Sequence, residues 1–219
     1  MAAYARARHS PAVLANRLRF EHRWGRPCLA YHACVRPGPP AAAAFSAFQE
    51  SMLRLEPSLL RVPVTAMHSN LVWLLPAREE FDRPKDELWR RHGSEWIDAL
   101  AGAAHTTRSF RLRYRHVVAT DAAIIAVADA PNGISALRHE LTSAIRVPGN
   151  LTGGELVHTT LFRYAMPLRD PASTLRWIAV SECDVDMDVS ELLIVRERVF
   201  PSLEYQILER LPLLPGDSG

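Results

Sequence analysis

The chain has 219 residues, of which 48% are hydrophobic and 23% charged, and its formal net charge is +2. This composition is typical of a globular protein with one large domain or two lobes around a shared core, and a charge so near neutrality does not by itself call for a nucleic-acid partner. No apolar run approaches the ~20 residues of a membrane helix, and the basic first residues lack the apolar core of a signal peptide, so we expect a cytoplasmic protein without a membrane partner.

Residues 1–63 predict an arm, a strand and a helix. Residues 1–27 are basic and without clear periodicity, so we expect an arm that wraps on the domain or is partly mobile. The run CLAYHACV at 28–35 predicts a buried strand, which the turn-forming sequence RPGPP ends. A helix should follow, with apolar residues at three- and four-residue spacing: Phe45, Phe48, Met52 and Leu55. Residues 56–63 read as a connector.

Residues 64–129 predict a strand, a helix and a hairpin. The strand covers 64–76 and ends at Pro76. The helix falls within 77–101, with these inner positions: Phe81, Leu88, Trp89, Trp96 and Leu100. The segment 110–118 alternates as a half-buried strand does, and 122–129 follows it at hairpin spacing.

The rest of the chain predicts helices and strands in irregular order. A helix comes first, with an apolar stripe of Ile134, Leu137, Leu141 and Ile145. Residues 155–164 predict a strand, a short helix follows Asp170, and 191–200 predicts a last strong strand. Irregular alternation with hairpins favours an α+β fold with largely antiparallel sheets over a doubly wound parallel sheet.

One sequence motif occurs twice: MHSNLVW at 67–73 and VHTTLFR at 157–163. Both copies have an apolar residue, a histidine, a small hydroxyl residue, Asn or Thr, a leucine and another apolar residue. Alternate residues of a strand share a face, so His68 should point with Asn70, and His158 with Thr160. Each strand would then present an imidazole and a polar hydrogen-bonding group on one side.

This arrangement suits a displacement reaction at the phosphorus of a phosphodiester. Such a reaction needs a base on the attacking oxygen and an acid on the leaving oxygen, and histidine serves both tasks near neutral pH. A hydroxyl or amide two residues further on can donate to a non-bridging phosphate oxygen and stabilise the developing charge. The alternative is that both histidines are structural residues of two strands that are alike by chance.

The tetrapeptide HTTL at 158–161 resembles the His-x-Thr/Ser-apolar signature of the two-histidine phosphoesterase superfamily, which includes bacterial RNA 2′,5′-ligase-like proteins and cyclic phosphodiesterases. RVPVTAMHSNLVWLLP is similar to the first motif strand of that superfamily, and ELLIVRERVFPSLEYQILERLPL to its last strand and closing segment. The resemblance implies one bilobal domain over 28–219, in which two antiparallel sheets with outer helices flank a central cleft. His68 and His158 would lie on central strands of the two sheets, with both rings open to the cleft.

The resemblance also implies a function for this cleft. His68 and His158 would be the catalytic acid and base, and Asn70 and Thr160 would bind the phosphate. The reaction would be metal-independent hydrolysis or ligation of 2′,3′-cyclic phosphates, related cyclic phosphates or 2′,5′ phosphodiesters, without a cofactor. The substrate would be RNA or a nucleotide-like phosphodiester, and we expect a monomer.

Asn70 departs from the superfamily pattern, which has Thr or Ser at this position. The asparagine amide can donate a hydrogen bond, but its reach and geometry differ from those of a hydroxyl. Two alternatives therefore stay open. One is a binding module for RNA or a phosphorylated small molecule that has lost efficient chemistry, and the other is an enzyme of specialised metabolism with a reassigned cleft.

Four further residues are candidates for substrate binding. Arg111 and Arg113 share one face of the 110–118 strand, where they would bind phosphate in the cleft or form a solvated sheet face. Arg163 and Tyr164 follow the second motif directly. Tyr164 is expected on the face of His158, where it would stack on a base or pack at the rim of the core.

The remaining histidines, acidic residues and cysteines give no metal signature. His32 either faces the cleft or is a buried structural histidine, and His105 begins another HTT that we interpret as a coincidence in a loop. No third ligand stands at fixed spacing beside either motif, HExxH is absent, and the three cysteines form no CxxC pair. The alternating aspartates of SECDVDMDVS lack the Gly and Glu of a calcium loop and read as a solvated acidic turn.

Overall fold

The computed structural model describes residues 10–129, 134, 137–139, 143 and 156–216. The helices and strands, in chain order, are α1 (Pro11–Leu14), β1 (Pro27–Val35), α2 (Pro39–Leu55), β2 (Leu59–Arg61), β3 (Ser69–Leu75), α3 (Lys85–Thr106), β4 (Phe110–Ala119), β5 (Ala123–Asp129), β6 (His158–Tyr164), α5 (Pro171–Val180), β7 (Val185–Val189), β8 (Glu191–Val199) and β9 (Glu204–Pro212). None of the described helices is both long enough and apolar enough to span a membrane.

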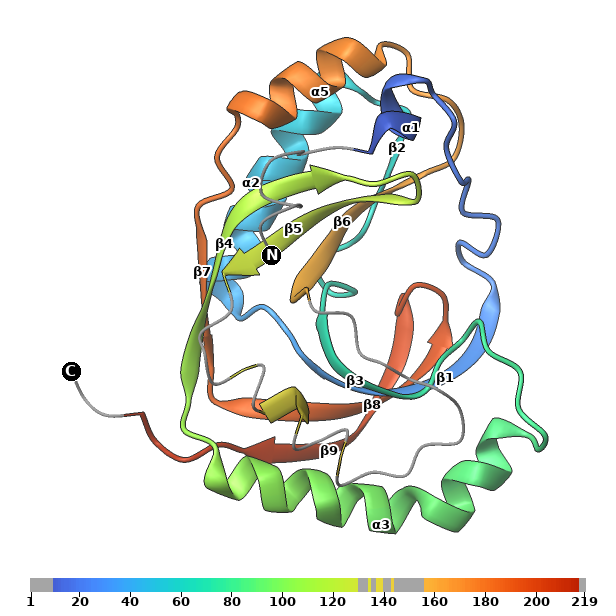
Figure 1. The fold of residues 1–219 in the computed structure, drawn as a ribbon, viewed down its shortest axis with the longest axis vertical. Coiled ribbons are helices and arrows are strands. Elements are labelled where there is room, and N and C mark those ends of the chain that lie inside the picture. The colour runs from blue at the N-terminus through green and yellow to red at the C-terminus, as the bar shows by residue number, and fades with distance from the viewer. Residues whose placement is uncertain (1–9, 130–133, 135–136, 140–142, 144–155, 217–219) are drawn as a thin grey trace.

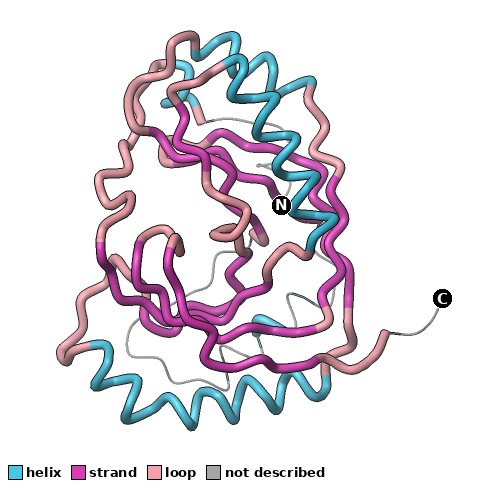
Figure 2. Tube along the Cα trace, turned by 180° about the vertical axis from the view of Figure 1, so that it is seen from behind, coloured by secondary structure: helices cyan, strands magenta, loops and turns pink. Residues whose placement is uncertain are grey.

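The strands form two antiparallel sheets (Figure 1). One has the order β3-β1-β8-β9 and the other the order β2-β6-β5-β4-β7. Helix α3 packs against β8 and β9, whereas α2 contacts β7 and α5 contacts β4. Seen from behind in Figure 2, the long helices lie on the outside of the molecule, at its two ends and along one side. The α+β class with two antiparallel sheets, which the sequence predicts, is therefore confirmed.

A single cluster of buried apolar side chains extends over both sheets. Most helix positions predicted to face inward are buried in it, whereas Leu55 is 41% exposed at the end of α2. A buried hydrogen bond also joins the two sheets, because the Ser69 Oγ of β3 lies 2.7 Å from the Tyr114 hydroxyl of β4. Of the apolar stripe predicted after β5, Ile134 and Leu137 are buried. Its other two members, 141 and 145, lie outside the described residues.

Four predicted elements differ from the structure in extent or type. The helix predicted within 77–101 is α3, which begins after Pro84 and continues to Thr106, so Phe81 precedes it and His105 lies in a helix rather than in a loop. The strand predicted over 64–76 begins only at Ser69, because residues 64–66 form a turn. The predicted connector contains β2, a three-residue strand that pairs with β6. The predicted acidic turn is β7, in which Val185, Met187 and Val189 are buried and the aspartates between them point outward. The alternation of that short segment is the pattern of a half-buried strand.

The described part of the basic arm lies against the domain. The Ser10 amide donates to the Ala119 carbonyl at 2.9 Å, and the Arg19 amide donates to the Asp121 carbonyl at 2.7 Å. The Asn16 side chain exchanges two hydrogen bonds with the backbone of Leu168, at 2.9 and 3.0 Å. Residues 10–26 are thus fixed to the five-stranded sheet and to the segment that precedes α5.

Candidate active site

The two copies of the repeated motif share a backbone irregularity. In β3, Leu71 is an extra residue, because its two neighbours in the strand pair with consecutive residues of β1. In β6, Leu161 is extra in the same way opposite β5. A β-bulge of this kind reverses the alternation of faces from that point on. The residue five positions after each histidine, Trp73 or Arg163, therefore points to the same side as the histidine.

Both bulged strands face one pocket with a volume of about 140 Å³, which we call the histidine pocket. Figure 1 shows β3 and β6 meeting near the centre of the molecule, one from each sheet. Each copy of the motif contributes the histidine and the residues two and five positions after it: His68, Asn70 and Trp73 from the first copy, and His158, Thr160 and Arg163 from the second. The four residues that the motif singles out are thus brought together.

The two histidines come from different sheets, as expected, but their strands are not both central. His158 is the first residue of β6, which lies between β2 and β5. His68 lies directly before β3, which is the outermost strand of its sheet. The prediction of a central strand is therefore wrong for His68. The C-terminal strands β8 and β9 add to the far side of β1, so β3 stays at the edge.

The His68 ring is held by the backbone two residues before it. Its Nδ1 lies 2.9 Å from the carbonyl oxygen of Ala66, and this bond requires Nδ1 to be the protonated nitrogen. In the neutral ring, Nε2 is then the free acceptor. For His158, an interaction with the backbone of Leu156, also two residues before it, raises the pKa and so opposes the effect of burial.

Desolvation lowers the pKa of both histidines. Burial brings the pKa of His68 to about 4, against the opposing effect of its backbone hydrogen bond, and Arg36 lowers it further. Burial also lowers the pKa of His158, together with the nearby Arg163 and Arg138. His158 is exposed to solvent on one side and lies against the lining of the pocket on the other. Burial thus favours the neutral form of both rings, and a phosphate anion beside them would favour their protonation.

Several other polar groups of the pocket suit an anion. Asn70 lines the pocket, and its side-chain nitrogen is the atom that can donate to an anion. Its side-chain oxygen can only accept, and no described residue donates to it. Arg138 Nη2 donates to the carbonyl oxygens of Asn70 at 2.7 Å and Leu156 at 3.2 Å, so one guanidinium bridges the two motif segments. Arg163 lines the pocket with a side chain that is 18% exposed. These cations, with Thr160, can bind non-bridging phosphate oxygens.

Trp73, the last residue of the first motif, is a site residue that the sequence does not indicate. Trp73 lines the pocket, and the sequence gives no sign of the bulge that turns it there. For His32 the sequence leaves open whether it faces the cleft or is a buried structural histidine. His32 of β1 is fully buried, as expected of a structural histidine. Its ring nevertheless stacks on His68, with centroids 5.0 Å apart and planes 19° apart, and packs edge-on against Trp73. No described residue hydrogen-bonds to either nitrogen of His32.

Tyr164 does not share the face of His158, so that expectation is wrong. The bulge at Leu161 turns Tyr164 into the core, where it is 1% exposed. Its hydroxyl donates to the Thr120 carbonyl oxygen at 3.0 Å. Arg163, one residue earlier, takes the position facing the pocket.

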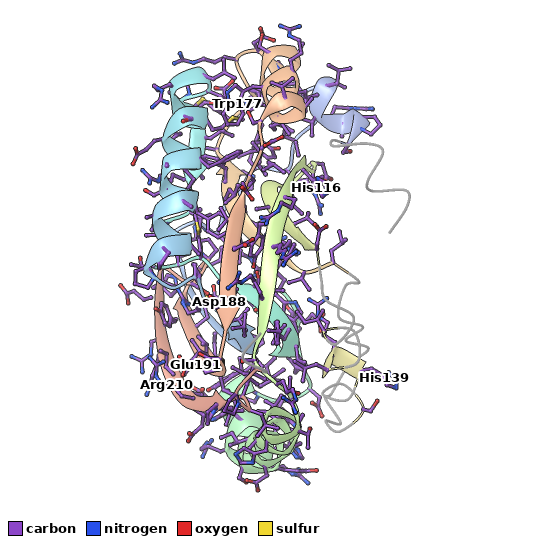
Figure 3. The ribbon with its side chains drawn as sticks, turned by 90° about the vertical axis from the view of Figure 1, so that its left-hand side faces the viewer. His116, His139, Trp177, Asp188, Glu191 and Arg210 are labelled. Atoms are coloured by element: carbon purple, nitrogen blue, oxygen red, sulfur yellow. The ribbon has the colours of Figure 1, made fainter. Side chains whose placement is uncertain are left out.

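Arg111 and Arg113 do not line the histidine pocket. They are exposed on β4, which pairs with the acidic strand β7. Figure 3 shows β7 beside β4, with Asp188 of β7 labelled. Arg111 Nε lies 2.6 Å from an oxygen of Asp188, and Arg113 is paired in register with Asp186. The alternative of a solvated sheet face therefore describes them. Among the described residues, no three His, Cys, Asp or Glu side chains are grouped so that they could hold a metal ion.

Comparisons with known proteins find the fold through structure alone. No family model matches the sequence, and no curated protein matches it. The crystal structure of TT0787 from Thermus thermophilus is similar with a TM-score of 0.61 and 21% identity, over 84% of this chain and 97% of that one. Escherichia coli LigT, in its complex with ATP, has a TM-score of 0.59 and 15% identity, over 86% of this chain and 99% of LigT.

Further solved structures give the same result. A conserved protein of unknown function, ATU0111 from Agrobacterium tumefaciens, has a TM-score of 0.59 and 13% identity, over 90% of this chain and 96% of that one. LigT has also been crystallised with 3′-AMP, NADP+ and phosphate. At such identities the likeness establishes the fold. The chain has the LigT-like fold, which is the architecture that its resemblance to two-histidine phosphoesterases implies.

Proposed function

We propose that this protein is a phosphodiesterase of the two-histidine type, which uses His68 and His158 as general acid and base without a metal. The observation that supports this most is the duplicated constellation. Two bulged strands from different sheets present a histidine, an amide or hydroxyl residue and a third side chain to one pocket. A structural role for the histidines would not require that both face the same pocket.

The mechanism follows from the free ring nitrogens. With Nδ1 bound to a backbone carbonyl, the Nε2 of one ring accepts the proton of the attacking water or hydroxyl. The other ring, protonated when the anionic substrate binds, donates its proton to the leaving oxygen. Asn70, Thr160 and Arg163 stabilise the charge on the non-bridging oxygens. The orientation of the bound substrate between the two rings determines which histidine is the base and which is the acid.

A nucleotide-like phosphodiester fits this pocket best, either a 2′,3′-cyclic phosphate, a related cyclic phosphate or a 2′,5′ linkage. Phosphate groups would lie at the cationic Arg163, and a base would stack on Trp73, since aromatic side chains are common platforms for nucleobases. The ligands crystallised with LigT, 3′-AMP and ATP among them, support ligands of this class for the fold. We propose that the protein acts on RNA ends or nucleotides as a cytoplasmic monomer.

A binding module is the second candidate. Asn70 supports it, because an amide replaces the hydroxyl that the superfamily pattern has. In this case ligands would bind to the pocket without turnover.

A panel of 2′,3′-cyclic nucleotides and 2′,5′-linked dinucleotides separates the two candidates. Turnover by the wild type in the presence of a chelator, lost in His68→Ala and His158→Ala, supports the enzyme. Binding without turnover in wild type, Asn70→Ala and Asn70→Thr supports the module. If the four variants match the wild type in both turnover and affinity, the histidine pocket is not the functional site.

A further inference from the structure

The described arm crosses from one sheet to the other at one end of the histidine pocket. The Glu21 amide donates to the Tyr164 carbonyl at the end of β6, at 2.8 Å. Four residues later, the Gly25 amide donates to the Phe200 carbonyl at 2.8 Å, and the Phe200 amide donates to Arg26 at 3.0 Å. Figure 1 shows this segment, in blue, descending along one side from α1 to β1. Phe200 lines the pocket, so the arm lies directly behind its wall.

The arm places one carboxylate beside the cation of the pocket. The Glu21 side chain is only 6% exposed. Its Oε2 lies 2.6 Å from Arg78 Nη2 and 4.0 Å from Arg163 Nη1. Both guanidinium groups lie near the ring of Phe200, at 5.5 Å for Arg78 and 5.9 Å for Arg163. Glu21 is thus the counter-charge between two neighbouring cations.

Arg163 has few direct bonds of its own to fix its direction. Its Nη1 donates to the Ala122 carbonyl at a long 3.5 Å. Its Nε is buried, and no described residue accepts a hydrogen bond from it. Burial lowers the pKa of Arg163, the neighbouring Arg78 lowers it further, and Glu21 opposes both effects. Glu197, which also lines the histidine pocket, raises the pKa of Arg163 too, but its effect is smaller than those of Glu21 and Arg78. Without Glu21, the buried guanidinium would keep only this weaker counter-charge against Arg78, which favours its rotation toward solvent.

We propose that Glu21 is a positioning residue, which holds the guanidinium of Arg163 at the wall of the histidine pocket so that it binds the substrate phosphate. The inference rests on the proposed function, because it assumes a phosphate ligand at Arg163. It makes residues 10–26 part of the phosphate site, although no residue of this segment lines the pocket. A carboxylate on the side of the guanidinium that faces away from the ligand holds this group in one orientation. A small displacement of a binding group in such a site lowers affinity or rate.

The test is Glu21→Gln, which keeps the size of the side chain and removes its charge. We expect the dissociation constant for inorganic phosphate to rise roughly tenfold, because Arg163 is no longer held in place. For a 2′,3′-cyclic nucleotide, KM should rise by a similar factor while kcat changes little. In an Arg163→Met background, Glu21→Gln should have no further effect on either quantity. Unchanged or tighter phosphate binding in Glu21→Gln would overturn the proposal.

Two matched variants separate positioning from stability. Asp121→Asn removes the other arm-to-domain ion pair, between Arg19 Nε and Asp121 Oδ2 at 2.8 Å, and should leave phosphate affinity unchanged. Arg78→Met leaves Glu21 facing Arg163 alone and should not raise KM. If Arg78→Met weakens binding as much as Glu21→Gln does, Glu21 acts only as the partner of Arg78 and the proposal fails. Should Glu21→Gln not fold, Glu21→Asp takes its place in this comparison, because it moves the carboxylate away from Arg163 and should also raise the dissociation constant for inorganic phosphate.

The failure of this inference differs from the failure of the proposed function. If His68→Ala abolishes turnover while Glu21→Gln behaves as Asp121→Asn does, only the role of Glu21 is wrong. If His68→Ala and His158→Ala keep full turnover, the proposed function is wrong, whereas phosphate binding by Arg163 still reports on Glu21.

Discussion

The first and second motif strands have the same shape and different chemistry. Both have a bulge at the leucine, and in both the residue five positions after the histidine faces the pocket. Beyond the histidines, the first strand offers an amide and an indole, and the second offers a hydroxyl and a guanidinium. The common backbone places the two rings. We propose that the differing side chains give the pocket two halves, one around Trp73 that stacks on a base and one around Arg163 that binds phosphate.

The largest expected effect tests what the two halves share. His68→Ala and His158→Ala should each lower turnover of a 2′,3′-cyclic nucleotide by roughly 10²–10⁴, since each removes an acid or a base. His105→Ala is the control, because His105 also begins an HTT sequence but is exposed at the end of α3. If the control loses as much activity as the two variants, the motif does not define the site.

The next effect tests where the halves differ at the second position. Asn70→Ala and Thr160→Ala should each cost about 2–4 kcal/mol of transition-state stabilisation, as for other donors to a developing anion. Asn70→Thr gives both motifs a threonine two positions after the histidine. Higher turnover of a cyclic phosphate in Asn70→Thr would indicate a weakened enzyme of the usual kind, and lower turnover on the true substrate would indicate a retuned one. No change in any of the three variants would contradict a role in turnover.

A smaller effect tests the difference at the fifth position. Arg163→Met should weaken inorganic phosphate binding by about 10- to 100-fold, because charge-assisted hydrogen bonds contribute about 1.5–3 kcal/mol. Trp73→Ala should leave phosphate affinity unchanged and weaken a nucleotide, because stacking of a base contributes about 1–3 kcal/mol. Isothermal titration with inorganic phosphate and with 3′-AMP measures both. Equal losses for the two ligands in Trp73→Ala would refute the division into a stacking and a phosphate half.

The smallest effect concerns the free energy of unfolding and comes from His68 of the first motif and His32, which stacks on it. The pKa of His68 is lowered to about 4, and burial holds the pKa of the stacked His32 well below its usual value. The unfolded chain therefore binds protons that the folded chain does not, and stability should fall as the pH drops from about 6.5 toward 4. His32→Phe keeps the stacked ring and should flatten this fall by at most about 1.4 kcal/mol per pH unit, the limit for one proton. Denaturant titrations at several pH values check this, and an unchanged slope in His32→Phe would contradict it.

The sequence predicts the fold class and the centre of the site because periodicity and the repeated motif are local signals. His68, Asn70, His158 and Thr160 meet in one pocket because strand alternation holds over the first residues of each motif. Alternation fails beyond the bulges. Because of the bulges, strand alternation does not indicate that Trp73 and Arg163 face the pocket. It also predicts the wrong face for Tyr164, which is buried in the core. Arg163 is a candidate only because it directly follows the HTTLF segment.

Pairings between distant segments were the other source of error. Nothing local in FRLRYRHVV indicates that an acidic strand will lie beside it, so Arg111 and Arg113 stayed candidates for the cleft. The contact between Glu21 and Arg163 joins residues 142 positions apart, which no spacing reveals. These contacts depend on how the chain folds back on itself rather than on periodicity.

The pH dependence of cyclic-phosphate hydrolysis, measured with a chelator present, tests the central claim most directly. If the two halves act as acid and base, the wild type should give a bell-shaped profile in which His68→Ala removes one limb and His158→Ala removes the other. Activity that is lost with the chelator and restored by a divalent ion would contradict this account, as would identical profiles for wild type and both variants.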